Sequence, residues 1–393
     1  MRAGARRSCA GHLALWRCCG GPAQCPAVHK GDDMNRPMLT AAFCAAAWAS
    51  CAHAAPASGV LADVLDRPAI QSPIAAKKLL LSVALAGDRL VAVGPRGHIL
   101  VSLDAGVTWQ QSQVPLSSDL TAVHFPSPKL GWAVGHDGVV LATADGGVTW
   151  TKQLDGRMVN DLVLADINAK LAADPESAVL QQLAAEAERN REQGADKPFL
   201  DVWFESDTTG YVVGAYGLLL KTTDGGQTWQ SWFDRADNPR LMNLYSIRPA
   251  AGVLYAAGEG GTVLKLDPAA QRFVAVPVEY TGSMFGIADG GNAVLVYGLR
   301  GNAFRSADGG ATWTKIDTKL RASVVGGTTL APGTVVLADQ GGRLALSNDG
   351  GATFELVPLQ RNLPLTSITS AGAGRLAVTG PFGVMVVAPD APR

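Results

Sequence analysis

The eight residues Thr143–Trp150 (TADGGVTW) recur at four other places in the chain with small changes. These copies are Ser102–Trp109, Thr222–Trp229, Ser306–Trp313 and Ser347–Phe354. A short Asp, Ser or Thr side chain accepts hydrogen bonds from nearby backbone N–H groups and closes a tight turn. The Gly that follows supplies the positive φ of a hairpin, and Thr-Trp begins the next strand with a large surface to bury. The pattern therefore predicts one hairpin repeated along the chain.

These residues are similar to the Asp-box, or BNR, repeat, which also occurs in sialidases. Repeated copies of one site fit a repeated turn better than a single catalytic centre, so we interpret the boxes as structural clasps. The residues assigned to the clasps are Asp104, Trp109, Asp145, Trp150, Asp224, Trp229, Asp308, Trp313, Asp349 and Phe354.

A second frame, made of an apolar run, Gly-x-x-Gly and another apolar run, accompanies the boxes. Its copies are Gly94/Gly97, Gly135/Gly138, Gly214/Gly217, Gly258/Gly261, Gly298/Gly301, Gly380/Gly383 and, with one Gly replaced, Ala338/Gly341. Most copies lie 40 to 44 residues apart, and each unit has turn signals for short strands. This is the period of a propeller blade, so the sequence predicts an all-β fold, a seven-bladed β-propeller with Asp-box repeats.

The seventh unit has room for only three strands. We expect its fourth strand to come from the N-terminal side, near Pro68–Pro73, so that the first and last segments pair. Such closure removes the free sheet edge that otherwise invites aggregation.

Residues 157–197 interrupt the repeat between blades two and three. The apolar residues Val159, Val163 and Ile167 recur at helical spacing, which predicts an inserted helical hairpin. Asp174-Pro175-Glu176 is a typical start for its second helix, and Gly194 is a typical stop.

Residues 1–54 are expected to be absent from the mature protein, which would be a single propeller domain spanning 55–393. Met34 is the better start, because Arg36, the apolar run 39–49 and Ala52-His53-Ala54 form the layout of a secretory signal peptide. The sequence thus predicts export, into a periplasm or, in a photosynthetic host, a compartment such as the thylakoid lumen. A lipid anchor at Cys51 is the weaker alternative.

All six cysteines lie within residues 1–54, so the mature chain would have no disulfide and no cysteine metal ligand. Without those residues the chain has 27 basic and 32 acidic side chains, a balance that argues against a nucleic-acid partner. Its remaining histidines are His98, His124 and His136, too few to indicate a metal site. We expect no cofactor.

In a propeller, the Gly-x-x-Gly turns and the connections between blades lie on one face, and the boxes lie on the other. We call the first of these the tip face and predict that it binds a partner, since loops on a rigid scaffold carry most binding residues. The candidate residues are Arg96, His136, Asp137, Tyr216, Glu259, Arg300, Gln340 and Phe382 from the turns, and Trp232, Arg235 and Arg240 from one connection. That connection, residues 232–240, is either a contact loop or an apolar plug under the inserted helices.

Over about residues 60–388 the chain resembles the photosystem II stability/assembly factor family. The resemblance depends on the combined frame of apolar runs, Gly-x-x-Gly and Asp box behind a signal peptide. It implies a chaperone-like role in holding newly made membrane subunits, with an arginine-rich patch to which Arg96, Arg235, Arg240 and Arg300 would correspond in reduced form. The helical insertion departs from the family pattern.

The favoured hypothesis is a non-enzymatic, monomeric scaffold that binds an integral membrane protein complex, with no catalytic residues. The alternative is a sialidase-like glycoside hydrolase, for which Asp137 and Glu259 would be the carboxylate pair, or a glycan-binding module. Fold alone does not decide between them.

Overall fold

The structure is a computed structural model that describes residues 62–359 and 361–388. The described residues form one compact unit. The predicted signal peptide, the start at Met34 and Cys51 lie outside the described residues.

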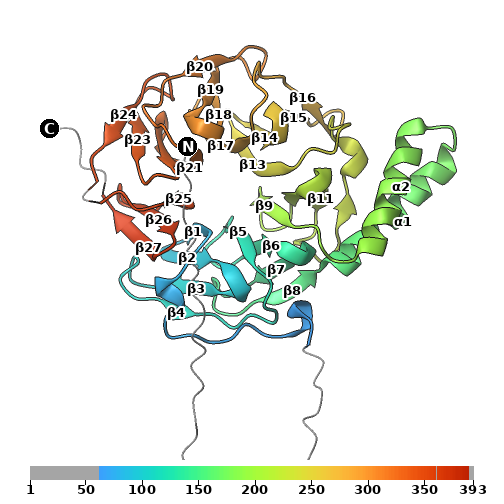
Figure 1. Ribbon diagram of the computed structural model, residues 1–393, viewed down its shortest axis with the longest axis horizontal. Helices are drawn as coiled ribbons and strands as arrows, with labels where there is room; N and C mark the ends of the chain where they lie inside the picture. The colour runs from blue at the N-terminus through green and yellow to red at the C-terminus, as the bar shows by residue number, and fades with distance from the viewer. Residues whose placement is uncertain (1–61, 360, 389–393) are drawn as a thin grey trace, which may run out of the picture. The chain divides into compact units, whose positions relative to one another are not determined.

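Seven antiparallel sheets form a ring, with the first strand of each sheet nearest the centre (Figure 1). In the described part of the chain six blades have four strands and the seventh has three. The strands are β1 (Ser82–Ala86), β2 (Arg89–Val93), β3 (Ile99–Ser102) and β4 (Gln110–Gln111) in blade one; β5 (Leu120–His124), β6 (Gly131–Gly135), β7 (Val140–Thr143) and β8 (Thr151–Leu154) in blade two; β9 (Phe199–Phe204), β10 (Gly210–Gly214), β11 (Leu219–Thr222) and β12 (Gln230–Ser231) in blade three; β13 (Leu244–Ala250), β14 (Val253–Gly258), β15 (Val263–Asp267) and β16 (Arg272–Ala275) in blade four; β17 (Met284–Asp289), β18 (Val294–Gly298), β19 (Ala303–Ser306) and β20 (Thr314–Ile316) in blade five; β21 (Val324–Ala331), β22 (Thr334–Asp339), β23 (Leu344–Ser347) and β24 (Glu355–Val357) in blade six; and β25 (Ser367–Ser370), β26 (Leu376–Gly380) and β27 (Gly383–Val387) in blade seven. The predicted seven-bladed propeller with one helical hairpin is confirmed.

The Asp boxes form closed hydrogen-bond networks between the third and fourth strands of their blades. In blade one, Thr108 N donates to Asp104 Oδ1 at 2.8 Å, and Gly106 N donates to Ser102 Oγ at 2.8 Å. Trp109 then donates its indole N–H to the Gly106 carbonyl at 3.2 Å, so the ring is held over the turn. Because every bond is local, the motif positions a tryptophan and presents no free catalytic group.

These networks also lower the pKa of the box carboxyls. The Thr108 hydroxyl and N–H bring the pKa of Asp104 to about 2, and Thr353 does the same for Asp349. The ordinary value of an unfolded Asp is about 3.9, so the stabilisation is complete above that pH. The stabilisation decreases as pH falls below the unfolded pKa, because the unfolded chain then binds a proton that the folded protein does not. It is lost once pH has fallen through the folded pKa near 2, where the carboxyl is protonated in both states.

We therefore expect the free energy of unfolding to decrease as pH falls from about 4 to about 2. Urea denaturation across this range measures it. The variant Asp104→Asn/Asp349→Asn keeps an acceptor oxygen at both sites but cannot titrate, so its stability should change less steeply with pH. Equal slopes for the two proteins would show that the boxes do not cause the acid sensitivity.

The predicted closing strand at Pro68–Pro73 is wrong. This segment lies along the outer edge of blade one, where Ala69 N donates to the Val114 carbonyl at 3.1 Å and Ser72 N donates to Gln111 Oε1 at 2.8 Å. Its prolines lack the N–H groups that a strand ladder needs. The chain instead reaches blade seven through a single turn of 3-10 helix, Ala75–Lys77, and Leu80 N donates to the Gly380 carbonyl at 3.1 Å.

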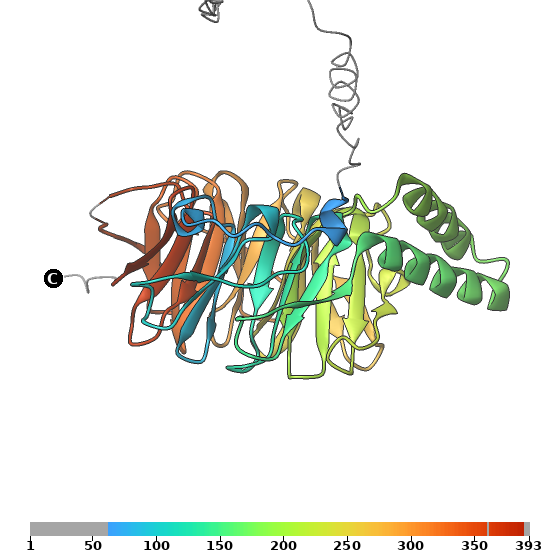
Figure 2. The ribbon, with the colours of Figure 1, turned by 90° about the horizontal axis from the view of Figure 1, so that it is seen from below.

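Two helices, α1 (Gly156–Ala173) and α2 (Ala178–Gln193), lie between β8 and β9 and project from the rim beside blade three (Figures 1 and 2). Val159, Val163 and Ile167 are buried against the blade, in one cluster with Phe233. In the described residues, no helix is both long and apolar enough to cross a membrane.

The helix start predicted at Asp174-Pro175-Glu176 is wrong by one turn. Asp174 ends α1, with its N–H bonded to the Lys170 carbonyl, and Ser177 caps α2 by accepting from Leu180 N. Ala172 and Ala173 are strong helix formers that extend α1, so Ser177 becomes the next capping side chain. Gly194 ends α2 in a positive-φ conformation (φ 90°), as the sequence predicts.

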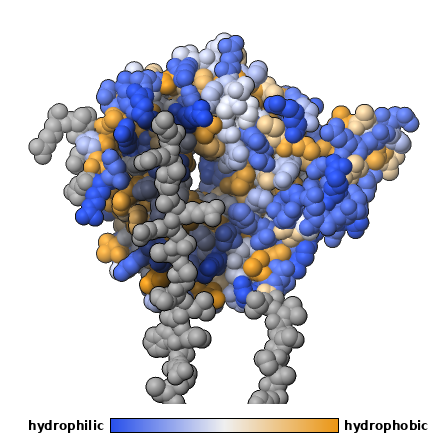
Figure 3. Space-filling view, viewed as in Figure 1, coloured by the Kyte–Doolittle hydropathy of each residue, from blue (hydrophilic) through white to orange (hydrophobic). Residues whose placement is uncertain are grey.

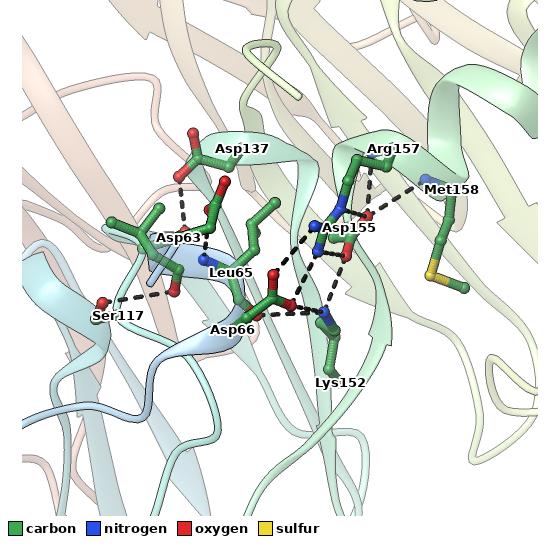
Figure 4. Close-up of polar contacts among 11 residues, drawn as sticks. Asp63, Leu65, Asp66, Ser117, Asp137, Lys152, Asp155, Arg157 and Met158 are labelled. Atoms are coloured by element: carbon green, nitrogen blue, oxygen red, sulfur yellow. Dashed lines mark hydrogen bonds and ion pairs between the residues drawn. The ribbon is translucent and has the colours of Figure 1, made fainter. Parts of the chain in front are cut away.

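A charged cluster connects the first turn of α1 to Asp66, in the segment that precedes β1 (Figure 4). Arg157 Nη2 lies 2.8 Å from Asp155 Oδ2 and 3.1 Å from Asp66 Oδ1, and Lys152 Nζ lies 2.9 Å from Asp155 Oδ2. Asp155 also caps the helix through the N–H groups of Arg157 and Met158. Burial raises the pKa of Asp155, but the bonds from Arg157 and Lys152 outweigh it and keep this pKa well below its usual range. The cluster therefore sets where the hairpin leaves the ring.

Candidate binding face and central channel

The Gly-x-x-Gly turns of blades one to five are single turns of 3-10 helix that begin where the second strand ends. They are η3 (Pro95–Gly97), η4 (His136–Gly138), η5 (Ala215–Gly217), η7 (Glu259–Gly261) and η8 (Leu299–Gly301). The middle residue has a positive φ, at 60° in Arg96, 54° in Tyr216 and 58° in Arg300. Residues other than glycine rarely adopt a positive φ. Its repetition at these turns therefore indicates a turn geometry that the surrounding structure imposes.

Three of these five tips are bonded to the next blade. Arg96 N donates to Asp119 Oδ1 at 2.7 Å, Tyr216 N to Asn243 Oδ1 at 2.8 Å, and Arg300 N to Ser323 Oγ at 3.2 Å. Every acceptor residue immediately precedes the first strand of the following blade. The backbone of these turns belongs to one blade and is hydrogen-bonded to the next. The Cα positions of the exposed side chains are therefore fixed.

The exposed candidates on the tip face are Arg96, His136, Tyr216, Arg240, Arg300, Gln340 and Phe382. Tyr216 and Phe382 are 50% and 63% exposed, which is unusual for large aromatic side chains. Arg235 is partly buried, with its guanidinium 5.3 Å from the centre of the Trp232 ring. Arginines and aromatics at rigid, exposed positions are the residues that most often anchor a protein interface.

Asp137 and Glu259 are used locally. Ser118 Oγ donates to Asp137 Oδ2 at 2.6 Å, and Asn243 N donates to Glu259 Oε2 at 3.5 Å. The two residues belong to blades two and four, with blade three between them. Both carboxylates serve the turns that carry them, so this geometry does not support the hydrolase alternative.

The placement of Trp232 on the binding face is wrong, because its side chain is only 3% exposed. The ring packs edge-on against Tyr211 at 5.6 Å, and neighbouring Phe233 is buried in the cluster under α1. Ala236 then bridges to Phe273 on the outer strand of blade four. This connection is the apolar plug of the two alternatives, and its exposed residues, Asp237, Pro239 and Arg240, lie in its second half.

The frame at Ala338/Gly341 is displaced by one residue. Asp339 N donates to the Arg343 carbonyl at 3.0 Å, as Gly94 N does to the His98 carbonyl at 2.9 Å in blade one. Asp339 therefore takes the first Gly position and is buried. Its carboxylate accepts from Arg343 N at 2.9 Å, which explains why a polar residue is tolerated there.

A channel of about 560 Å³ passes between the first strands of all seven blades; the hollow at the centre of the ring is visible in Figure 3. Seven equivalent positions, defined by their register with the second strand, carry Ala84, His124, Trp203, Arg248, Ala288, Thr328 and Thr369. Three neighbouring blades thus place large polar or aromatic side chains at a level where the other four carry small ones. In a repeat fold, side chains that differ in this way from those at equivalent positions indicate a candidate binding site.

Asp201 and Arg248 form an ion pair in the channel wall. Asp201 Oδ2 accepts from Arg248 Nη1 at 2.6 Å and from Ile247 N at 2.9 Å, and Asp201 Oδ1 accepts from Val202 N at 2.9 Å. Burial raises the pKa of Asp201, and the Arg248 charge opposes that rise. Burial also holds the pKa of His124 well below its usual value, so this imidazole is neutral at pH 7.

The sequence reading missed this channel site. The signal that would have found it is the comparison of equivalent repeat positions, where Arg248, Trp203 and His124 replace Ala or Thr. Within the part of the chain that the structure describes, no group of three His, Cys, Asp or Glu side chains converges as a metal site.

These features define a class of protein, an Asp-box β-propeller with a rigid, exposed tip face and a polar central channel. A family model described as "Photosynthesis system II assembly factor YCF48" matches residues 79–172 and 182–316, which is more than half of the chain. The protein belongs to this family.

Two curated relatives match parts of the chain. Photosystem II assembly lipoprotein Ycf48 of Synechococcus sp. (strain CC9902) is 27% identical over 158 residues, which cover 40% of this chain and 35% of that protein. Photosystem II stability/assembly factor HCF136, chloroplastic, of Oryza sativa subsp. japonica is 32% identical over 93 residues, which cover 24% and 20%. The chain thus matches about a third or less of the length of these relatives.

Two solved structures share the fold. "YCF48 bound to D1 peptide" has a TM-score of 0.57 and 17% identity, and the match covers 83% of this chain and 97% of that one. YCF48 from Cyanidioschyzon merolae has a TM-score of 0.57 and 17% identity, with coverage of 82% and 98%. At this identity the likeness shows the architecture alone.

Proposed function

We propose that this protein is an exported, non-enzymatic assembly factor that holds an exposed segment of an integral membrane protein against its tip face. The observation that carries the proposal is the set of exposed Arg96, Tyr216 and Arg300 side chains on turns whose backbone is fixed, together with the exposed Phe382 on the corresponding turn of blade seven. Membership of an assembly-factor family supports it. One structural relative is described as bound to a peptide, which supports a polypeptide segment as the kind of ligand.

The physical argument is preorganisation. Binding an extended segment costs entropy on both sides, and a rigid display removes the cost on the propeller side. Arginine and aromatic side chains then gain the most per contact, because they combine large apolar area with directed hydrogen bonds. Arg96, Arg240 and Arg300 favour a segment that carries carboxylates beside apolar residues.

The test uses a photocrosslinking residue in cells. It is introduced at Gln340 on the tip face or, as a control, at Val107, which lies in an Asp box on the opposite face and is 80% exposed. We expect integral membrane protein to be crosslinked from Gln340 and not from Val107. Arg96→Glu/Arg300→Glu should reduce the crosslinked product about tenfold or more.

The matched control is Lys129→Glu/Arg375→Glu, which makes the same change of charge in turns between first and second strands, on the box face. It should leave the crosslink unchanged. Equal losses in both double variants would reduce the effect to net charge, and crosslinks to soluble proteins alone would reject the proposal.

The hairpin needs a different design from a simple deletion. Replacing it with a linker would expose the apolar cluster that Val159, Val163 and Ile167 cover, so lost binding would then report misfolding. Val179 is 65% exposed on α2, and a crosslinker placed there samples the hairpin without disturbing its core.

A further inference from the structure

We propose that the central channel binds a small monoanionic carboxylate with an apolar body, whose carboxylate is held by Arg248. The site is separate from the tip face, and the variants that test it differ from those that test the proposed function. Failure of either proposal can therefore be recognised without the other.

The first step concerns which polar groups remain free. Within the described part of the chain Arg248 donates through Nη1 alone, to Asp201 Oδ2, to the Ile247 carbonyl at 2.7 Å and to the Val202 carbonyl at 3.1 Å. Among the described residues its Nε and Nη2 have no partner, and the side chain is 30% exposed to the channel. Asp201 already accepts three bonds, so the free edge of this pair consists of donors.

His124 adds a donor from blade two. Its Nδ1 accepts from Phe204 N at 3.2 Å, so the neutral ring carries its proton on Nε2. The imidazole lies 4.1 Å from the Trp203 ring, and the Arg248 guanidinium lies 5.6 Å from the same ring. Three neighbouring blades therefore present N–H donors and one flat aromatic surface side by side.

Tyr297 adds a hydroxyl from the second strand of blade five. It reaches the channel lining because Gly286 and Gly327 have no side chains, and a Cβ on Gly286 would collide with the hydroxyl. The hydroxyl has no hydrogen-bond partner among residues 62–359 and 361–388. The two glycines thus leave space for the Tyr297 hydroxyl, which is available to bond a ligand.

The opposite wall leaves space for a ligand. At the level of Arg248 it carries only Ala84, Ala288, Thr328 and Thr369. Toward the tip face the lining is mixed: Leu81, Leu200, Tyr245, Phe285 and Val325 offer apolar contacts beside the hydroxyl groups of Thr121 and Thr366. The volume of about 560 Å³ lies within the range of small-molecule sites.

The donor set selects the charge of the ligand. The Nε and Nη2 groups of an arginine form a fork that matches the two oxygens of a carboxylate. Asp201 and Arg248 together have no net charge, which disfavours a dianion such as phosphate. An apolar body would contact Trp203 and the lining toward the tip face. Two kinds of molecule carry a carboxylate next to an apolar group: a free organic acid and a polypeptide chain at its C-terminus.

Calorimetric titration of the mature protein with phenylacetate tests the site, and phenylacetamide, its uncharged isostere, is the control ligand. We expect the acid to bind and the amide to bind at least about tenfold more weakly. Tyr297→Phe removes only the unpartnered hydroxyl and should weaken the acid about tenfold. Thr328→Phe fills the opposite wall and should abolish binding, whereas Arg375→Lys, outside the channel lining, should have no effect.

A hexapeptide ending in Phe, with a free or an amidated C-terminus, distinguishes the two sources. Tighter binding of the free-acid peptide than of phenylacetate assigns the site to a chain terminus, and the reverse order assigns it to a free acid. The proposal is overturned if neither acid binds, if amides bind as well as acids, or if Tyr297→Phe and Thr328→Phe, folded by urea denaturation, bind like the parent.

Discussion

Replacing Phe204 with alanine is expected to lower the free energy of unfolding by about 3–5 kcal/mol. The side chain is 1% exposed at the boundary of blades two and three. Its ring stacks on Trp132 with centroids 3.5 Å apart and meets the edge of Trp229 at 6.1 Å. Truncation removes the transfer free energy of the ring and leaves a cavity that the two rigid sheets cannot close. Urea denaturation followed by tryptophan fluorescence measures the change.

Phe382→Ala is the matched control, since that ring is 63% exposed at the tip of blade seven. Its effect on stability should stay within about 0.5 kcal/mol. Similar losses in the two variants would mean that the boundary between blades two and three is not a tightly packed contact. A loss confined to Phe204→Ala would identify this boundary as a main source of stability beside the inserted hairpin.

The blade repeat could be predicted because its determinants are local. An Asp, two Gly and a Thr within eight residues are enough to close a turn, and the turn fixes the register of the two strands beside it. The prediction of the closing strand was wrong for the opposite reason, because its determinants are not local. Whether Pro68–Pro73 pairs with blade seven or lies along blade one depends on partners such as Val114 and Gly380 that are distant in sequence.

Burial of the connection at Trp232 is also a tertiary property. Trp, Phe and Arg in one segment fit a contact loop and a plug equally well in composition. The decision depends on Tyr211 and Phe273, which approach from blades three and four. For Arg240 and Phe382 strand order alone predicts the face on which their turns lie, and both side chains are exposed.

The channel was missed because a register irregularity shapes it. In blades two to six the ladder between first and second strands shifts near the start of the first strand, at Thr121, Leu200, Tyr245, Phe285 and Val325. A bulged residue loses its cross-strand partner and turns the strand locally. All five of these residues line the channel. Alternation along the sequence does not reveal such a shift, so the inward-facing set cannot be read from periodicity.

Replacing Asp201 with alanine should lower the free energy of unfolding by about 3–5 kcal/mol, the second large effect expected. The carboxylate is 7% exposed and accepts from Val202 N, Ile247 N and Arg248 Nη1. Its loss leaves the Arg248 charge without compensation in the channel wall. The cost comes mainly from that uncompensated charge and from two backbone N–H groups without an acceptor.

The double variant Asp201→Ala/Arg248→Leu separates these two costs. It removes the uncompensated charge, so it should be more stable than Asp201→Ala, while the N–H groups of Val202 and Ile247 remain unsatisfied. The gain on adding Arg248→Leu, measured by urea denaturation, is the part of the loss due to the charge. If the double variant is less stable than Asp201→Ala, then Arg248 stabilises the channel wall by itself, through the carbonyls of Val202 and Ile247 and its packing on Trp203. That result would show that the ion pair with Asp201 is not the main way in which Arg248 stabilises the channel wall.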